Sequence, residues 1–404
     1  MNSIQSGERY ESIDFLRGVA VLGILVMNIQ SFSMPMAAYF NPTALGDRGP
    51  IDFAIWTASH LFFDQKFMTI FSLLFGAGIV VMTARAAERG ARPAVLHYRR
   101  MFALLIFGLI HAYLIWDGDI LVLYSVCGAI VYLFRRLSPV PLVAIALTSL
   151  IIGSGLLWYG GSQLPHAPAA ARQEFIDFWA PPAQLLQRET AAFRGSWWQQ
   201  MPVRVENSLE FHLSDIWLWG VWRTGAVMLI GMALFKWRVV TGERSSRFYA
   251  WMAVAGFLVG VPIIAFGVFT MNAHGWETFY SFFIGGLYNY WASLLVAGGW
   301  IGLLITIWRR APRTLIAPFI AVGRTAFSCY ILTSLICTTI FYGHGFGWFG
   351  YVSRPGQLAI TLAVWIVLLS VAPLWLRHFR FGPLEWIWRT VTYWERPDGL
   401  FLRH

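Results

Sequence analysis

Long apolar runs follow one another along almost the whole chain. A membrane-spanning helix needs about 20 consecutive apolar residues, and runs close to that length recur throughout the sequence. They predict ten spans, at residues 15–33, 67–84, 100–116, 120–134, 140–159, 216–235, 248–270, 281–307, 316–341 and 358–376. We therefore expect an all-α, polytopic helical membrane protein with about ten transmembrane helices.

The composition agrees with this pattern. Of the 404 residues, 57% are hydrophobic and 12% are charged, whereas about 25% of residues are charged in an ordinary soluble domain. A single soluble core cannot bury that much apolar surface, so a water-soluble enzyme is excluded. The three cysteines, Cys127, Cys329 and Cys337, lie inside apolar runs and predict neither a disulfide framework nor a zinc motif.

The formal net charge of +10 comes almost wholly from arginine. These arginines do not form one basic face, so we expect no nucleic-acid partner. They gather in every second connection between spans, which the positive-inside rule assigns to the cytoplasm. The basic residues of these connections are Arg9, Arg85, Arg89, Arg92, Arg99, Arg100, Arg135, Arg136, Lys236, Arg238, Arg244, Arg247, Arg309, Arg310, Arg313, Arg377, Arg380, Arg389 and Arg396. This pattern predicts a multi-pass protein of the bacterial inner membrane with both termini in the cytoplasm.

The chain is expected to form one integral membrane domain, residues 1–404. Residues 160–214 are the only sizeable polar segment and contain the amphipathic stretches FIDFWA and LLQRETAAF. We interpret this segment as an outer, periplasmic insertion that forms a lid. Residues 381–404 are expected to be a cytoplasmic C-terminal segment with an interfacial amphipathic stretch. The sequence GFGWFG at 345–350 matches a dinucleotide fingerprint, but it lies between two spans and predicts only a turn.

Polar groups inside the apolar runs mark a candidate site, because a charge at the bilayer centre costs at least about 2.5 kcal/mol. Asn28 lies about 21 Å along a helix from Asp14, in the outer half of the first span. His111 and Arg223 also fall in outer halves, and Lys66 begins a span from that side. The residues predicted to share this level are Asn28, Lys66, His111, Asp117, Asp119 and Arg223.

This group suits a polar site that opens outward. His111 would act as a general base, with Asp117 or Asp119 orienting its imidazole or sharing its proton. Asn28 and Arg223 would donate hydrogen bonds to an oxyanion or an anionic substrate. The competing interpretation is that these groups only form hydrogen bonds between helices.

Two residues are further candidates for substrate binding. Lys66 and His60, near the outer rim, are candidates for substrate binding, and His60 is also an alternative to His111 as the catalytic histidine. Two aspartates and one histidine could hold an ion, but their spacing is not a zinc signature and we predict no metal.

At the inner ends of two spans, Arg17 and Arg324 suit the phosphates of a nucleotide-bearing donor, because guanidinium groups bind phosphate in a bidentate manner. Snorkelling or lipid headgroup contact is the alternative role for these two arginines.

Five blocks of the sequence resemble the YeiB-like bacterial membrane proteins (DUF418), a family of unknown function. The blocks are IDFLRGVAVLGILVMNI at 13–29, KFMTIFSLLFGAG at 66–78, HAYLIWDGDIL at 111–121, VGRTAFSCYILTSLICTTIFY at 322–342 and FGPLEWIWRTVTY at 381–393. They occur in the expected order and run nearly from end to end of the chain.

The first block is also similar to the opening of the transmembrane acyltransferase superfamily, which includes heparan glucosaminide acetyltransferase and the acyltransferase-three proteins. This resemblance implies a transmembrane-acyltransferase-like bundle that moves an acyl group from cytoplasmic acyl-CoA to an acceptor on the far side, usually a sugar. Asp14, Arg17 and Gly18 match the motif, and Asn28 falls at its active-site asparagine. The histidine expected soon after that asparagine is missing from IQSFSMPMAAYF. Either His111 or His60 has taken that role, or acyl transfer has been lost.

The sequence therefore favours an acyltransferase that uses acyl-CoA as co-substrate and a sugar or another hydroxyl or amine compound as acceptor. A transporter or flippase for lipids or solutes is the alternative, and a non-catalytic scaffold is a third interpretation. Membrane lipids are expected partners, and a homodimer is left open.

Overall fold

The computed structural model describes residues 10–46 and 48–394, in which every regular element is a helix. In chain order these are α1 (Glu11–Ser33), α2 (Ala37–Phe40), α3 (Pro50–Phe62), α4 (Lys66–Glu88), α5 (Pro93–Leu114), α6 (Leu121–Val131), η1 (Tyr132–Phe134), α7 (Pro139–Gln163), η2 (Leu164–His166), α8 (Ala169–Trp179), α9 (Ala183–Arg194), α10 (Trp197–Glu210), η3 (Phe211–Gly225), α11 (Ala226–Lys236), α12 (Ser246–Ala273), η4 (Tyr280–Gly285), α13 (Gly286–Arg310), α14 (Arg313–Arg324), α15 (Ala326–Phe341), α16 (Arg354–His378) and α17 (Pro383–Tyr393). The expected all-α class is confirmed.

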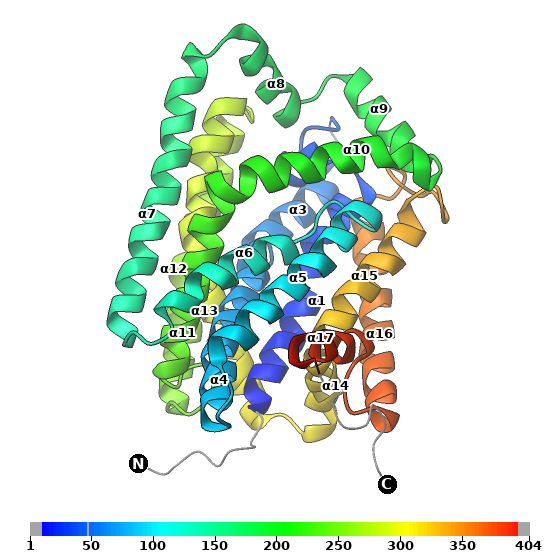
Figure 1. Ribbon diagram of the computed structural model, residues 1–404. Helices are drawn as coiled ribbons and strands as arrows, with labels where there is room; N and C mark the ends of the chain where they lie inside the picture. Colours follow the sequence, from blue (N-terminus) through cyan, green and yellow to red (C-terminus); the bar gives the residue numbers. More distant parts are fainter. Residues whose placement is uncertain (1–9, 47, 395–404) are drawn as a thin grey trace.

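Eight helices in the described part of the chain are long and apolar enough to cross a membrane. They are Glu11–Ser33, Pro50–Glu88, Pro93–Leu114, Pro139–His166, Trp197–Lys236, Ser246–Ala273, Tyr280–Arg310 and Arg354–His378. Most of them stand side by side as an upright bundle (Figure 1). Each contains one of the spans expected from hydropathy, to within two residues where the expected span 100–116 extends past Leu114, so the multi-pass membrane architecture is confirmed.

Two of the ten expected spans have a different form. The segment expected at 120–134 is the helix Leu121–Phe134, which is too short to cross a bilayer alone. The segment expected at 316–341 consists of two helices, α14 and α15, which meet at an angle of 84°. Thr325 lies between them with non-helical backbone angles (φ −116°, ψ 31°).

Contacts on both sides hold this bend. Glu385 of α17 accepts hydrogen bonds from the backbone N–H groups of Phe327 (2.7 Å) and Ser328 (3.1 Å) and from Ser328 Oγ (2.5 Å). Its carboxylate therefore caps the amino end of α15. On the other side, Gly18 lets α1 touch α14, since a Cβ there would lie 1.9 Å from the carbonyl oxygen of Phe319. As a result, α14 is fixed against α1 while α15 turns away.

The segment expected as an outer loop, 160–214, is largely helical. Its two amphipathic stretches form α8 and α9, and α10 continues without a break through η3 into α11. We refer to α8, α9 and α10 as the loop-helix layer, and to the end of the bundle that it covers as the loop-helix end (Figure 1).

Hydropathy placed the start of this span at 216, but the helix begins at Trp197. The first turns of this helix contain polar residues, which lower its hydropathy there. In the structure these polar side chains form hydrogen bonds with one another. Ser196 and Gln199 form a capping box, and Arg204 donates a hydrogen bond to Gln200 Oε1 (2.8 Å) while both side chains are buried.

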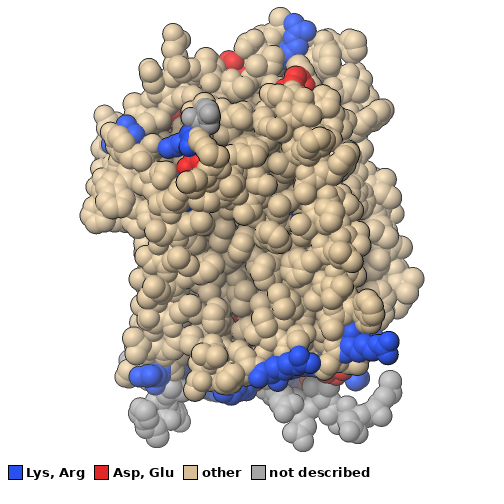
Figure 2. Space-filling view, turned by 180° about the vertical axis from the view of Figure 1, so that it is seen from behind, with Lys and Arg blue, Asp and Glu red and all other residues tan. Residues whose placement is uncertain are grey.

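Charge divides the surface into an apolar middle and two polar ends (Figure 2). The amino end of α1 and the carboxyl ends of α4, α11 and α16 lie together at the end opposite the loop-helix layer (Figure 1). The arginine-rich connections of the sequence analysis follow these helices, so we refer to this as the basic end. Arg9 and Arg396 lie outside the described residues.

The C-terminal helix α17 packs against α5 and α15. Trp388 Nε1 donates to the backbone oxygen of Arg100 (3.1 Å), while Ile387 and Val391 are exposed. This helix lies within the stretch expected to be interfacial, and the rest of that stretch, residues 395–404, lies outside the described residues.

Candidate functional site

His111 lies between an aspartate and a serine in the interior of the bundle. Its Nδ1 is 2.8 Å from Asp119 Oδ1, and its Nε2 is 2.9 Å from Ser334 Oγ. His111 is in the last turn of α5, Asp119 is in the turn before α6, and Ser334 comes from α15. All three are buried. The chain thus forms one continuous Asp–His–Ser series of hydrogen bonds from segments that are far apart in sequence.

The turn between α5 and α6 fixes the aspartate. The second carboxylate oxygen of Asp119 accepts a hydrogen bond from the Val122 backbone N–H (2.9 Å) at the start of α6. The approach of these two helices requires a glycine, because a Cβ on Gly108 would lie 2.6 Å from Val122 N and 3.1 Å from Asp119 Oδ2. Asp119 is therefore held from both sides before it meets His111.

The tautomer of His111 decides the direction of these hydrogen bonds. An ionised carboxylate only accepts, so His111 donates its Nδ1–H to Asp119. The neutral imidazole then presents Nε2 as an acceptor, and Ser334 donates its hydroxyl proton to it. In this tautomer the Nε2 of His111 faces the hydroxyl group of Ser334.

A narrow pocket opens beside Ser334. It is lined by Val21, Ile24, Leu25, Asn28, Phe32, Trp116, Tyr330, Thr333 and Ser334. Its free volume is about 10 Å³, close to the space that one water molecule needs. We refer to it as the serine pocket.

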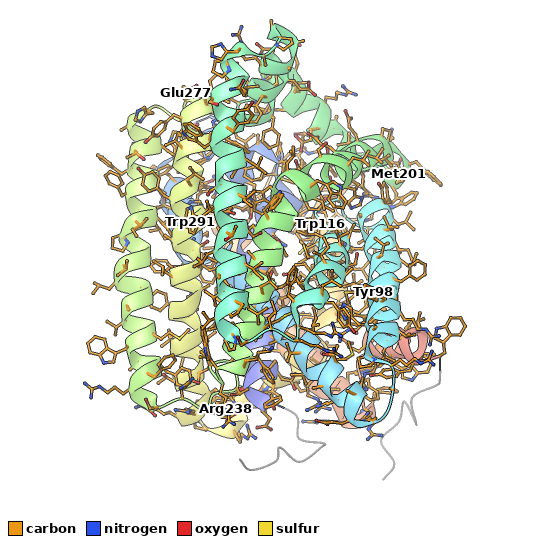
Figure 3. The ribbon with its side chains drawn as sticks, turned by 60° about the vertical axis from the view of Figure 1, so that its left-hand side comes forward. Tyr98, Trp116, Met201, Arg238, Glu277 and Trp291 are labelled. Carbon is orange, nitrogen blue, oxygen red and sulfur yellow. The ribbon has the colours of Figure 1, made fainter. Side chains whose placement is uncertain are left out.

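Two residues that carry hydrogen-bond donors line the serine pocket, one on α1 and one in the turn after α5. Asn28 contributes an amide from α1, and Trp116 contributes its indole. Trp116 is buried and stacks on Phe32 with ring centroids 3.9 Å apart. Its Nε1 is buried without a hydrogen-bond partner among the described residues. Figure 3 places Trp116 inside the bundle, below Met201 of the loop-helix layer.

Asp117 takes a different direction from Asp119. Its carboxylate accepts a hydrogen bond from Asn207 Nδ2 of α10 (2.6 Å), so it ties the α5–α6 turn to the loop-helix layer. Burial raises the pKa of Asp117, and the hydrogen bond from Asn207 opposes that shift. Of the two aspartates that the sequence left open, the structure places Asp119 against His111.

The other predicted residues form a second buried network. Lys66 Nζ donates to Asn289 Oδ1 (2.6 Å) and to the backbone oxygen of His60 (2.5 Å). Asp64 accepts from Asn289 Nδ2 (2.8 Å) and from the Tyr39 hydroxyl (3.0 Å), and His60 Nδ1 is 3.1 Å from its carboxylate. We refer to these residues as the Asp64 network. None of them lines the serine pocket.

Arg223 is also held away from the serine pocket. It donates to the backbone oxygen of Tyr290 (2.6 Å) and to Ser293 Oγ (2.7 Å), and its guanidinium lies 4.7 Å from the Tyr290 ring centroid. The six groups expected at one level therefore divide between separate clusters. Depth along a span predicts a level in the membrane, but not which side of the bundle a side chain faces.

A second cavity, of about 320 Å³, lies at the basic end. Three arginines line it: Arg313 and Arg324 from α14 and Arg377 from α16. Glu11 lines it as well and forms an ion pair with Arg313. We refer to this cavity as the arginine pocket. Arg324 was expected here, whereas the guanidinium of Arg17 pairs with Asp14 (3.1 Å) and is not among the lining residues.

Sequence reasoning missed Ser334. A serine in an apolar helix is a common packing residue, and its partner His111 is 223 positions away. The contact of this serine with His111 exists only in the folded protein, where α15 lies close to the end of α5.

Comparison with known proteins identifies the family. Residues 234–395 match the family described as "Protein of unknown function (DUF418)". Over 388 residues the chain is 32% identical to the uncharacterized protein YeiB of Escherichia coli strain K12. This alignment covers 95% of this chain and 96% of YeiB. The chain belongs to the DUF418 family. The expected resemblance to YeiB-like proteins is thereby confirmed.

Two further relatives align over nearly the whole chain. The uncharacterized protein YxaH of Bacillus subtilis strain 168 is 30% identical over 414 residues, covering 97% of each chain. An uncharacterized 39.9 kDa protein of Bacillus acidopullulyticus is 25% identical over 411 residues. The DUF418 match itself includes Arg324, Ser334 and Glu385, whereas His111 and Asp119 lie before it.

Proposed function

We propose that this protein is a transmembrane acyltransferase in which His111 is the general base. The observation that carries the proposal is the placement of His111 between Asp119 and Ser334, beside a pocket that Asn28 also lines. An imidazole oriented by a carboxylate and facing a hydroxyl is the arrangement that activates an oxygen nucleophile. A positioned general base of this kind contributes about 10²–10⁴-fold to a rate.

The serine pocket supplies the second requirement of acyl transfer. Attack on a carbonyl group places negative charge on its oxygen, and donors fixed in a water-poor site stabilise that charge. Asn28 and the indole N–H of Trp116 are the groups that would donate to it. The partnerless Trp116 Nε1 supports this role, because a buried donor without a partner costs about 1–3 kcal/mol.

The arginine pocket is the proposed site for the phosphates of acyl-CoA. Three guanidinium groups at one cavity favour a polyanionic ligand. Arg324 ends α14 and Ser334 lies on α15, about 12 Å along that helix from Ala326 at 1.5 Å per residue. An extended thioester arm would follow α15 from the arginine pocket to the serine pocket.

The orientation follows from the charge rule. The arginine-rich connections meet at the basic end, so we place this end and both termini in the cytoplasm of a bacterial cell, with the protein in its inner membrane. Acyl-CoA would enter there. The loop-helix layer would then lie on the outer side, where a sugar or another hydroxyl or amine compound accepts the acyl group.

Thiol release from acetyl-CoA and longer acyl-CoAs tests the proposal, using the full chain in lipid nanodiscs with a mixture of candidate sugar acceptors. We expect saturable turnover that falls at least a hundredfold in His111→Gln. His97 provides a matched control, since it is also buried on α5 but binds the backbone oxygen of Gly128. His97→Gln should retain turnover if it folds.

Arg313→Ala and Arg377→Ala should raise the acyl-CoA concentration needed for half-saturation, with a smaller effect on the maximal rate. Absence of both acyl-CoA binding and thiol release in the folded wild-type protein would refute the proposal.

Solute transport is the second candidate function, favoured by the Asp64 network. Lys66 and Arg223 are buried charges inside spans, and such charges often mark a substrate pathway. Flux of an anionic solute in proteoliposomes that persists in His111→Gln but is lost in Lys66→Met would support transport over acyl transfer.

A further inference from the structure

Ser334 is the hydroxyl group that His111 contacts. It is buried on α15, lines the serine pocket, and lies 2.9 Å from His111 Nε2. A serine that only packed between helices would satisfy its hydroxyl on its own helix, as the neighbouring Thr333 does by donating to the backbone oxygen of Cys329 (2.8 Å). Ser334 has a longer contact of this kind with the backbone oxygen of Tyr330 (3.3 Å), and in addition it reaches across to His111 on another helix (2.9 Å).

The Ser334 hydroxyl has two hydrogen-bond partners, and the contact with His111 is the shorter of the two. The Ser334 hydroxyl is 3.3 Å from the backbone oxygen of Tyr330 and 2.9 Å from His111 Nε2. With Asp119 accepting the Nδ1–H of His111, the imidazole Nε2 needs a donor. Ser334 supplies this donor, and its oxygen lone pairs are left to face the pocket.

We infer that Ser334 is a covalent nucleophile that carries the acyl group between donor and acceptor. The inference rests on the proposed acyltransferase function and adds an acyl-serine intermediate to it. Ser334, His111 and Asp119 have the mutual contacts of a serine nucleophile, its base and the carboxylate that orients the base.

The first half of the reaction acylates the serine. Ser334 Oγ bonds to the thioester carbonyl carbon while its proton moves to His111 Nε2. The carbon–sulfur bond then breaks, and His111 gives the proton to the leaving thiolate. The products are an ester on Ser334, a free thiol and a neutral imidazole.

The second half returns the enzyme to its starting state. The acceptor hydroxyl loses its proton to His111 and attacks the ester carbonyl, and the bond between that carbon and Ser334 Oγ breaks. His111 then returns the proton to Ser334. No oxidant, reductant or metal is needed, and charge is balanced in each half.

The serine pocket is narrow. Its free volume of about 10 Å³ is close to that of one water molecule, and the stacked rings of Phe32 and Trp116 form part of its lining. Entry of either a thioester or an acceptor requires the lining residues to move, and entry of both at once would require a larger movement. An acyl group held on Ser334 lets the two substrates use the pocket in turn.

An activated ester tests the serine directly. Full-length protein in detergent would be incubated with p-nitrophenyl acetate and digested, and the peptide containing Ser334 analysed by mass spectrometry. We expect an acetyl group on Ser334 of the wild type, none at this position in Ser334→Ala, and acylation slowed at least a hundredfold in His111→Gln. Thr338→Val is the matched control, because Thr338 is also buried on α15, donates to the backbone oxygen of Leu335 on its own helix (3.3 Å) and does not line the serine pocket; this variant should acylate like the wild type.

Folding is monitored by size-exclusion profile and thermal midpoint. Ser334→Cys provides a second variant, since a thiol at this position can accept the acetyl group if the alanine variant fails to fold. A folded wild-type protein that gains no acetyl group on Ser334, or gains it equally fast in His111→Gln, would overturn the inference.

Thiol release from acyl-CoA in the same variants separates this inference from the proposed function. Full turnover by Ser334→Ala would leave the acyltransferase function standing and remove the covalent step. Acetylation of Ser334 by the ester, without thiol release from any acyl-CoA, would support the nucleophile and reject the proposed donor. Absence of both reactions would reject both proposals.

Discussion

The carboxylate of Glu385 binds Ser328 at the first turn of the helix that carries Ser334. A residue of the C-terminal helix therefore sets the position of α15, although it lies more than 50 positions along the chain and touches neither pocket. We regard Glu385 as a positioning residue.

Glu385→Ala should lower both stability and Ser334 reactivity. The loss of a side-chain cap typically costs about 0.5–2 kcal/mol, and α15 would be free to shift relative to His111. Thermal unfolding and the acylation rate with p-nitrophenyl acetate measure the two effects. Glu385→Gln retains an acceptor oxygen and should restore most of the acylation rate; if it does not, the charge itself matters more than the cap.

Gly108→Ala should misplace Asp119. The added Cβ would lie 2.6 Å from Val122 N and 3.1 Å from Asp119 Oδ2, so the α5–α6 turn must move. A displacement of about 1 Å can cost about a hundredfold in rate, which the acylation assay would detect. Gly78→Ala is the control, because its Cβ would meet nothing within 4 Å. Equal acylation rates in the two variants would contradict this account of Asp119.

Glu189 should make the loop-helix layer pH-sensitive. Burial raises its pKa from 4.5 to about 7, against a hydrogen bond from the Met36 backbone N–H. Because the folded-state pKa is the higher one, the stabilisation is complete below about pH 4.5 and is lost as pH rises through about 7.

We expect the thermal midpoint of the wild type to fall between pH 5 and pH 8, relative to that of Glu189→Gln, which does not titrate. Parallel midpoint curves for the two proteins would show that this carboxyl group is not the source of the pH dependence.

Asp64→Asn should destabilise the protein by about 1–3 kcal/mol, because it removes the negative charge that Asn289 links to the buried Lys66 and weakens the hydrogen bonds that Asp64 accepts from Asn289 and Tyr39. The double variant Asp64→Asn/Lys66→Met should recover part of the loss. Tyr39→Phe removes one hydrogen bond to Asp64 without changing a charge, and should cost only about 1 kcal/mol. Chemical denaturation in detergent ranks the three variants, and a Tyr39→Phe loss as large as that of Asp64→Asn would argue against a charge effect.

The spans could be predicted from the sequence because hydropathy is a local property. The bend at Thr325 could not, since the residue that stabilises it, Glu385, belongs to a helix 58 positions after Phe327. Likewise, the early start of α10 depends on the pairing of Arg204 with Gln200 inside the fold.

The candidate site was predicted in part for a related reason. Asn28, His111 and Asp119 stand out as polar residues in or beside apolar runs; in the structure Asn28 lines the serine pocket, while His111 binds Asp119 and contacts the pocket residue Ser334. Ser334 carries no such signal, and the choice between Asp117 and Asp119 depends on which carboxylate the turn directs inward. Contacts between distant helices decide both.

The bend between α14 and α15 fixes where α15 begins. Glu385 holds the first turn of α15. The direction in which the Ser334 side chain leaves the helix therefore depends on the number of residues between Thr325 and Ser334. One residue inserted within that interval would rotate Ser334 by about 100° around the helix axis and turn it away from His111. The contact between Ser334 and His111 thus depends on the number of residues between Thr325 and Ser334 as much as on the identity of the two residues.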